Sequence, residues 1–223
     1  GAGNILVRIT PASQRSFTAS VPRLRTAEPL VGKSNEWRDT LAQISRARTT
    51  SRPLLIVGEP GSGKTSLAMG QIYRPAQPAP DIAIMDSGAI PMVGTRRWFE
   101  RLEQHIEEHH RIVIRNIDAP EQRTLDGIRT LVASLPRPNR VTLTATVSDE
   151  REGRDLALSL GSHLVVAPPL REHPNDIASL WSHFAEREHP GSKIALDPEA
   201  LRALQRYSWP GNLRELQPLV ADV

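Results

Sequence analysis

The sequence contains no cysteine, which excludes disulfide bonds, zinc–thiolate centres and thiol catalysis. Aromatic residues make up only 4% of the 223 positions, and no apolar run approaches the ~18 residues that a membrane-spanning helix needs. Arginine far outnumbers lysine, but the basic residues are scattered and the formal net charge of +3 is modest, so no nucleic-acid surface is indicated. No secretory signal is visible. We therefore expect a cytoplasmic protein without membrane contact.

An apolar content of 39% supports a buried core, and the length allows one mid-sized domain or a larger and a smaller one. Short apolar runs alternate with stretches of helical spacing in the first two thirds of the chain. The expected strands span residues 53–57, 82–85, 112–114, 141–147 and 164–166, and the expected helices span residues 35–48, 66–73, 97–109 and 121–135. This α/β alternation predicts a parallel sheet with helices on both faces.

The strand pattern stops after Pro168-Pro169, and three helices are expected beyond it. They span residues 175–188, 197–207 and 212–220. Asp197-Pro198 is a typical helix start, with a capping aspartate and a proline at the first helical position. We divide the chain into a proline-rich lead-in (1–29) with one expected strand (4–9), an α/β nucleotide-binding unit (30–170) and a small all-helical lid (171–223).

A complete phosphate-binding loop, Gly58-Glu-Pro-Gly-Ser-Gly-Lys64-Thr65, lies between the first of these strands and a helix. Glycines let the backbone N–H groups face a phosphate, and the helix N-terminus adds positive potential. Lys64 would reach the β- and γ-phosphates, and Thr65 would offer a hydroxyl to Mg²⁺. The expected ATP or ADP ligands are Glu59, Pro60, Gly61, Ser62, Gly63, Lys64, Thr65 and Ser66. The competing interpretation is a glycine-rich turn without a ligand.

Three further segments occur with this loop: Val31-Gly-Lys-Ser34, Pro168-Pro-Leu-Arg-Glu-His-Pro-Asn-Asp-Ile177 and Tyr207-Ser-Trp-Pro-Gly-Asn-Leu-Arg-Glu-Leu216. Together the four blocks resemble, over residues 30–223, the AAA+ domain of bacterial sigma-54-dependent transcription activators, the enhancer-binding proteins. The resemblance implies a P-loop AAA+ fold with a nucleotide pocket between the sheet and the lid. It also implies that Val31 and Gly32 lie near the adenine and that Arg214 senses the phosphates. The alternative for Arg214 is a solvent-facing or ion-paired arginine.

In this family the AAA+ domain follows a sensory domain and precedes a helix-turn-helix. The chain begins at Gly1 without an initiator Met and ends where the DNA-binding part would start. We therefore expect a fragment that reaches DNA only through a domain outside it. The resemblance further implies self-association, commonly as a hexameric ring, although a dimer or a monomer is equally open.

The chain departs from the family at the end of the third strand. The family has Asp-Glu there, which hold Mg²⁺ and the attacking water, whereas this chain has Arg115 and Asn116. An arginine cannot ligate a hard cation and an asparagine cannot accept a proton, so we expect weak or absent hydrolysis. Asp118 is expected to point elsewhere. Asp86 falls where the family has an asparagine, so a carboxylate would survive near the γ-phosphate if Asp86 and Asn116 meet.

Arg115 allows two interpretations. Its guanidinium would replace Mg²⁺ in neutralising the phosphates, or it would fold across the site and pair with an acidic neighbour such as Glu59. The two family arginines that reach a neighbouring subunit correspond here to Gly153 and Ser159. Arg151 and Arg154 lie nearby and either substitute for them after a shift of one or two residues or are loop arginines in water, which is the interpretation we favour.

The family's Gly-Ala-Phe-Thr-Gly-Ala loop, which contacts sigma-54, is missing between residues 86 and 111. We therefore do not expect this chain to remodel a sigma-54 polymerase. His105 and His109 share a helix face, but a third ligand is missing and Ile106 occupies the glutamate position of the His-Glu-x-x-His pattern. They are predicted to form, with His110, an exposed polar face.

The sequence thus favours a regulatory AAA+ domain of a bacterial transcriptional regulator, in which nucleotide occupancy sets lid position or assembly. An active ATPase with rearranged catalytic residues is the first alternative. A nucleotide-free structural or oligomerisation module is the second. The intact Lys64-Thr65 pair argues against an empty loop, and Arg115-Asn116 argues against an efficient ATPase.

Overall fold

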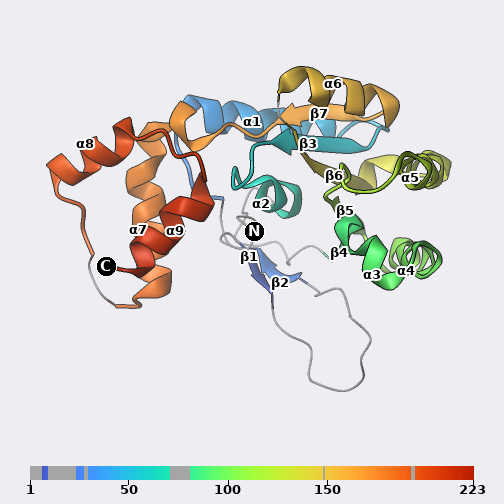
Figure 1. The fold of residues 1–223 in the computed structure, drawn as a ribbon, viewed down its shortest axis with the longest axis horizontal. Helices are drawn as coiled ribbons and strands as arrows, with labels where there is room; N and C mark the ends of the chain where they lie inside the picture. The colour runs from blue at the N-terminus through green and yellow to red at the C-terminus, as the bar shows by residue number, and fades with distance from the viewer. Residues whose placement is uncertain (1–6, 10–23, 28–29, 71–80, 148, 192–193) are drawn as a thin grey trace.

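The structure, a computed structural model, describes residues 7–9, 24–27, 30–70, 81–147, 149–191 and 194–223. Its main sheet has five parallel strands in the order β4-β5-β6-β3-β7 (Figure 1). They are β3 (Leu54–Gly58), β4 (Ile82–Asp86), β5 (Arg111–Arg115), β6 (Val141–Thr146) and β7 (His163–Val166). The five strands expected from the sequence are confirmed, as is the α/β fold class.

Two hydrophobic cores lie on the two faces of this sheet. Successive side chains of β3 alternate between them, because a strand directs its residues to opposite faces. Leu54 and Ile56 pack with α1 (Asn35–Ala47) and α2 (Lys64–Met69). Leu55 and Val57 belong to the core on the other face. That core is covered by α3 (Ile90–Val93), α4 (Thr95–Glu108), α5 (Gln122–Ser134) and α6 (Glu150–Ser159). Burial on both faces explains why β3 is an unbroken apolar run.

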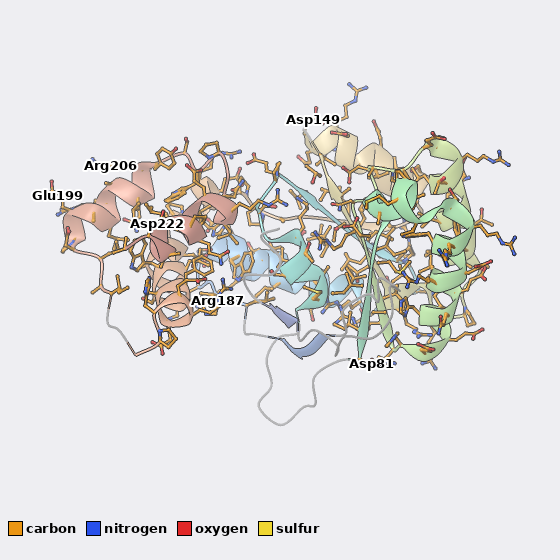
Figure 2. The ribbon with its side chains drawn as sticks, turned by 60° about the horizontal axis from the view of Figure 1, so that its bottom comes forward. Asp81, Asp149, Arg187, Glu199, Arg206 and Asp222 are labelled. Atoms are coloured by element: carbon orange, nitrogen blue, oxygen red, sulfur yellow. The ribbon has the colours of Figure 1, made fainter. Side chains whose placement is uncertain are left out.

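A third core belongs to the lid, which Figure 1 shows beside one end of the sheet. The lid contains α7 (Ile177–Glu188), α8 (Pro198–Arg206) and α9 (Leu213–Ala221). Its centre is built from the buried side chains of Phe184, Trp209 and Leu216. Glu199 and Arg206 lie on the outer side of α8, away from the sheet (Figure 2). The three expected lid helices are therefore confirmed.

Side-chain caps explain where several helices begin. Ser34 Oγ accepts a hydrogen bond from Trp37 N at the start of α1, and Asp197 caps α8 as expected. Asp149 Oδ1 accepts from Glu152 N at 2.9 Å and starts α6. Helix α6 was not predicted from the sequence, although an aspartate followed three residues later by a glutamate resembles a capping box.

Arg151 and Arg154 therefore lie on α6, and their expected place in a loop is wrong. Arg154 forms an exposed ion pair with Glu150, one helical turn away. Gly153 is buried, and a Cβ there would lie 3.0 Å from Val57 Cγ2. The helix thus packs against β3 at this position because the residue has no side chain.

The remaining elements are short. β1 (Val7–Ile9) and β2 (Leu24–Ala27) form a separate antiparallel pair. The connecting 3₁₀ helices are η2 (Ser87–Ala89), η3 (Pro138–Arg140), η4 (Leu170–Glu172) and η5 (Pro174–Asp176). Residues 4–6 of one expected strand and 71–73 of one expected helix lie outside the described residues. Within the described part of the chain, no helix has the length and apolar character needed to cross a membrane.

Candidate nucleotide site

The phosphate loop leaves the carboxyl end of β3 and enters α2. Gly61 and Gly63 adopt positive φ angles of 80° and 84°, which side-chain-bearing residues rarely adopt. Ser62 and Ser66 are buried beneath the loop, whereas Lys64 and Thr65 are half-buried. In open α/β sheets, ligands bind outside the carboxyl ends of the strands, which is where this loop lies.

Lys64 folds back onto its own loop. Its Nζ donates to the carbonyl oxygens of Gly58 at 2.9 Å and Glu59 at 2.7 Å. Burial lowers the pKa of Lys64 from 10.5 to about 8, and the nearby charges of Arg214 and Arg115 act in the same direction. The carboxylates of Asp118 and Glu59 oppose this lowering. The structure thus gathers three cationic and two acidic side chains around the loop.

The ends of β4 and β5 bring Asp86 and Asn116 together. Asn116 Nδ2 donates to Asp86 Oδ1 at 2.8 Å, and Gly88 N donates to the same oxygen at 2.9 Å. Asp86 pairs in register with Arg115, one residue before Asn116. The two side chains therefore meet, as the sequence analysis required for a carboxylate to survive here.

Arg115 does not pair with Glu59. Both oxygens of Glu59 accept from the guanidinium of Arg171, at 2.6 and 2.8 Å. This bidentate bond is the main cause that lowers the pKa of Glu59. Partial burial acts in the opposite direction, and the hydrogen bond from Asn212 lowers the pKa further. Arg115 Nε is buried without a hydrogen-bond partner among the described residues. Arg171 is thus the partner of Glu59, and the interpretation in which Arg115 blocks the site stays a prediction.

Asp118 lies nearer the loop than its sequence position suggested. Asn116 has a positive φ of 55°, and the chain then turns over β6, where Ile117 N donates to Thr144 O at 2.9 Å. Asp118 Oδ1 accepts from Thr146 N at 3.1 Å. Thr146 in turn pairs in register with Gly58, the first residue of the phosphate loop. Asp118 therefore lies close enough to the loop for its charge to act on Lys64, and its place relative to a bound phosphate stays a prediction.

The lid contacts the phosphate loop directly. Leu213 N donates to Gly61 O at 3.1 Å, and Asn212 Nδ2 donates to Pro60 O at 3.0 Å. Asn212 Nδ2 also lies 3.2 Å from Glu59 Oε2, while its Oδ1 accepts from Leu170 N at 2.7 Å. A Cβ at Gly61 would lie 2.2 Å from Gly211 O. Sequence analysis did not identify Asn212 or Arg171 as loop contacts.

The segment expected near the adenine lies where α1 meets the lid. Val31 packs against the lid core, and Gly32 lies under Trp37, since a Cβ there would lie 2.4 Å from the indole Cδ1. The Trp37 ring stacks on His173 at a centroid distance of 5.7 Å. The contact of Val31 and Gly32 with adenine remains a prediction.

Asp176 fastens this segment to the lid. Its Oδ1 accepts from the backbone N–H groups of Lys33 and Ser34, and its Oδ2 accepts from Ser34 Oγ at 2.6 Å. Burial would raise the pKa of Asp176, but these hydrogen bonds outweigh burial and lower the pKa. The buried carboxylate is therefore satisfied as an anion.

A cavity of about 520 Å³ lies beside the loop. It is bounded by residues of α1, α6 and the ends of β3 and β7: Gln43, Val57, Gly58, Glu59, Val147, Asp149, Glu150, Leu164, Val166, Ala167, Pro169, Arg171 and Glu172. Lys64, Thr65, Val31 and Gly32 do not line it. The cavity is therefore a neighbour of the expected phosphate and adenine positions, and the Glu59–Arg171 pair lies on its boundary.

Comparisons with known proteins agree with this architecture. Residues 171–223 match the family of AAA+ ATPase lid domains. The nitric oxide reductase transcription regulator NorR of Aliivibrio fischeri is 26% identical over 86% of this chain and 44% of its own length. NtrC of Rhizobium meliloti is 28% identical over 86% of this chain and 46% of its own length. The Psp operon transcriptional activator of Escherichia coli is 28% identical over 86% of this chain and 70% of its own length. The chain thus spans less than half of the first two relatives.

Solved structures show the same fold. NtrX from Brucella abortus, in complex with ATP, superposes over 88% of this chain and 52% of its own, with a TM-score of 0.63 and 23% identity. DnaA from Aquifex aeolicus, bound to AMPPCP, superposes over 82% of this chain and 58% of its own, with a TM-score of 0.52 and 14% identity. The chain therefore has the AAA+ fold with an AAA+ lid, and its sequence is similar to those of bacterial transcription regulators such as NorR and NtrC.

Proposed function

We propose that this chain is a regulatory AAA+ domain of a bacterial transcriptional regulator, which binds ATP or ADP and hydrolyses ATP weakly or not at all. The observation that carries this proposal is the gathering of Lys64, Arg115 and Arg214 around the phosphate loop. Such a site has positive charge for a polyphosphate, while the two family carboxylates at the end of β5 are replaced by Arg115 and Asn116.

A bound nucleotide would offset the repulsion between Lys64 and its cationic neighbours. The lowered pKa of Lys64 reflects burial and two cationic neighbours that the acidic side chains do not offset. An anionic phosphate would stabilise all three cations. Two unit charges about 4 Å apart are worth roughly 4 kcal/mol at an effective dielectric of ~20. The solved relatives that hold ATP, ADP or AMPPCP support this ligand class.

The residues fit Mg²⁺ poorly. Thr65 supplies a hydroxyl, but the family's metal-holding aspartate is replaced by the cationic Arg115, whose buried Nε has no hydrogen-bond partner among the described residues. We therefore assign to Arg115, in place of a metal ion, the role of neutralising the phosphate charge. Each lost stabilising group in an active site commonly costs ~10²–10³ in rate, which is the basis for weak hydrolysis.

Nucleotide occupancy would be transmitted to the lid through the loop itself. A phosphate would attract Lys64 away from the carbonyls of Gly58 and Glu59. Glu59 is also bonded to Arg171 and Asn212, so a movement of the loop changes its contacts with the lid. We propose that this change sets the lid angle or self-association, as a ring or a dimer. DNA would be reached through another domain, and sigma-54 would not be remodelled.

Calorimetric injection of ATP into this chain tests the proposal, with Lys64→Ala as the variant and Arg206→Ala, a basic residue on the outer side of α8, as the control. We expect saturable heat that decays to baseline after each injection, is lost in Lys64→Ala and is retained in Arg206→Ala. No heat in the unmodified chain, together with no protection from thermal unfolding by ATP, would favour the structural-module alternative.

The active-ATPase alternative has one observation in its favour, which is the position of Asp118. Its carboxylate, held by Thr146 N next to Gly58, is a hard oxygen donor close to Lys64 and would hold Mg²⁺ together with Thr65. Asp155→Asn, at an exposed residue of α6, is the control. Sustained phosphate release would select this alternative if it is lost in Asp118→Asn and unaffected in Asp155→Asn.

A further inference from the structure

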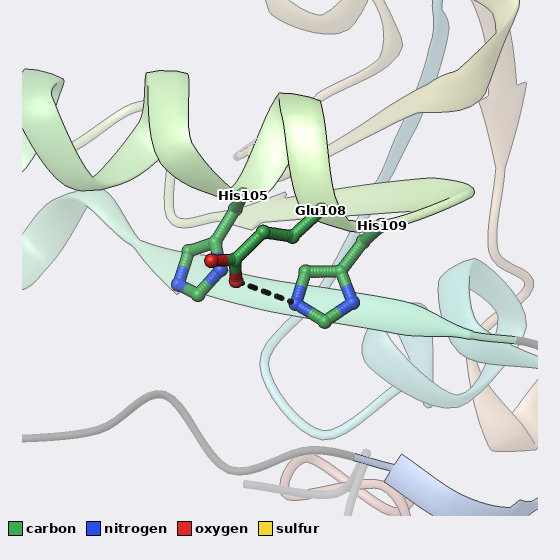
Figure 3. Close-up of side chains that lie close together, drawn as sticks. All are labelled: His105, Glu108 and His109. Atoms are coloured by element: carbon green, nitrogen blue, oxygen red, sulfur yellow. Dashed lines mark ion pairs between the residues drawn. The ribbon is translucent and has the colours of Figure 1, made fainter.

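The last turn of α4 brings together three side chains that sequence analysis did not group. The ligand atoms of His105, Glu108 and His109 all lie within 4.8 Å of one another. Figure 3 shows the three side chains leaving the helix on the same side, with the Glu108 carboxylate near both rings. Glu108 Oε2 lies 3.9 Å from His109 Nε2. Together they form a compact set of nitrogen and oxygen donors.

One expectation about these histidines is wrong. The side chain of His109 is only 2% exposed, so the histidines do not form an exposed polar face. Glu108 adds a third potential donor close to the two rings, which the sequence analysis did not count. His110 is exposed, as predicted.

Asp81 orients the His109 ring. His109 Nδ1 lies 2.8 Å from Asp81 Oδ1. A carboxylate can only accept this bond, so Nδ1 is the donor, and the tautomer with this proton has its lone pair on Nε2. Nε2 is buried, without a hydrogen-bond partner among the described residues, and faces Glu108. This carboxylate–histidine arrangement is the one that orients metal-binding histidines in proteins.

We propose that His105, Glu108 and His109 bind a divalent transition-metal ion, of which Zn²⁺ is the best candidate, with Asp81 as the positioning residue. Imidazole and carboxylate donors suit Zn²⁺, and three protein ligands leave a fourth position for water. Metal–ligand distances of ~2.0–2.2 Å place tetrahedral ligands about 3.4 Å apart. The observed donors, which lie within 4.8 Å of one another, therefore need to approach by at most about 1.4 Å, a shift that the long Glu108 side chain can make.

The proposed metal site is separate from the nucleotide site. Asp81 precedes β4 and His109 precedes β5, so the metal site lies at the amino ends of these strands, opposite the phosphate loop. Figure 2 shows Asp81 and Asp149 at opposite ends of the sheet. A metal ion would link the end of α4 to the start of β4 through His109 and Asp81. This inference does not depend on the proposed function.

The neighbouring charges are compatible with a cation. The Arg140 guanidinium contacts the end of α4, where it donates to the carbonyl oxygens of Ile106, His109 and His110. The Arg111 guanidinium donates to Ala68 O at 2.8 Å, while its backbone N–H donates to Asp81 O. Asp81 and Glu108 thus supply negative charge, and the nearby arginines are held by backbone carbonyls.

Titration of the chelator-treated chain with Co²⁺, followed by Zn²⁺ displacement, tests the proposal. We expect one equivalent of Co²⁺ with the visible absorption of a low-symmetry, histidine-ligated ion, and an increase in melting temperature with Zn²⁺. His105→Ala and Glu108→Gln should each weaken binding at least tenfold. His110→Ala and Glu107→Gln, which change exposed neighbours of the same types, should leave the affinity unchanged.

Asp81→Asn tests the positioning role, because loss of such a partner typically weakens metal affinity 10–100-fold while the three ligands remain. These variants change exposed or half-exposed side chains, so they avoid truncating the buried His109. Equal Co²⁺ affinity in His105→Ala, Glu108→Gln and the unmodified chain would overturn the proposal. Absence of any stoichiometric Co²⁺ or Zn²⁺ binding by the unmodified chain would overturn it as well.

Discussion

The Asp86 carboxylate accepts a hydrogen bond from the Asn116 amide, with 2.8 Å between Oδ1 and Nδ2. This bond joins the carboxyl ends of the neighbouring strands β4 and β5, on the same side of the sheet as the phosphate loop. The pair keeps one carboxylate beside position 116, but that carboxylate is already bonded to the amide and to Gly88 N. The Asp86 carboxylate is therefore held in place next to Arg115, the residue that precedes Asn116.

Asn116 should contribute to stability through its backbone as well as its amide. Its φ of 55° is strained for most residues and is tolerated by asparagine. We expect Asn116→Ala to lower the free energy of unfolding by about 2–3 kcal/mol, from strain and the lost bond to Asp86. Asn116→Gly, which loses the bond without the strain, should be about 1 kcal/mol less destabilising in urea unfolding. Equal losses in both variants would show that the backbone is not strained.

Arg115 should make nucleotide binding insensitive to Mg²⁺. We expect the unmodified chain to bind ATP with similar affinity in Mg²⁺ and in chelator, because the guanidinium neutralises the phosphates. Arg115→Ala should weaken binding in chelator by at least tenfold, since a hydrogen bond to a charged group is worth ~1.5–3 kcal/mol. Arg97→Ala, an exposed arginine of α4, is the matched control. Tighter Mg²⁺-free binding by Arg115→Ala would contradict the assigned role.

The pKa of Lys64 predicts a pH dependence of ATP affinity. In the free chain this pKa is about 8, whereas a bound phosphate stabilises the charged amine and raises it. The affinity should be constant below pH 8 and fall above it, by about tenfold between pH 7 and 9, with proton uptake on binding. Calorimetry in buffers of different ionisation enthalpy measures that uptake. Lys64→Arg keeps its charge, so its affinity should not change over this range. A flat profile in the unmodified chain would disprove the pKa assignment.

Two contacts between lid and loop should differ greatly in energy. Asn212 is buried, and Asn212→Ala leaves Leu170 N and Pro60 O without their hydrogen-bond partner. Asn212 also has a positive φ of 52°, which alanine adopts less readily. We expect a loss of about 2–3 kcal/mol in unfolding free energy. Arg171→Ala removes a largely exposed ion pair with Glu59 and should cost about 0–1 kcal/mol. A larger loss in Arg171→Ala than in Asn212→Ala would reverse this ranking.

The fold was predictable because its strongest signals are local. The apolar run of β3, the loop after it and the Asp197-Pro198 helix start each depend on adjacent residues. Helix α6 was missed because its polar, charged sequence has a weak apolar stripe, and its main signal was the Asp149 cap.

The site was only partly predictable, because its decisive contacts join residues far apart in the sequence. Asn212 reaches Pro60 across 152 positions, and Arg171 reaches Glu59 across 112. The position of Asp118 depends on the turn at Asn116, whose positive φ could not be read from residue type alone. His109 is buried because Asp81 and the start of β5 meet the end of α4, which no pattern within the helix encodes.

The most direct test of the account is the fate of ATP bound to this chain. Excess protein is incubated with γ-labelled ATP, and bound nucleotide and released phosphate are followed in parallel, with Lys64→Ala as the control. We predict that the unmodified chain retains ATP, that Lys64→Ala does not, and that the bound ATP stays intact. Rapid release of labelled phosphate by the unmodified chain, abolished in Lys64→Ala, would contradict this prediction.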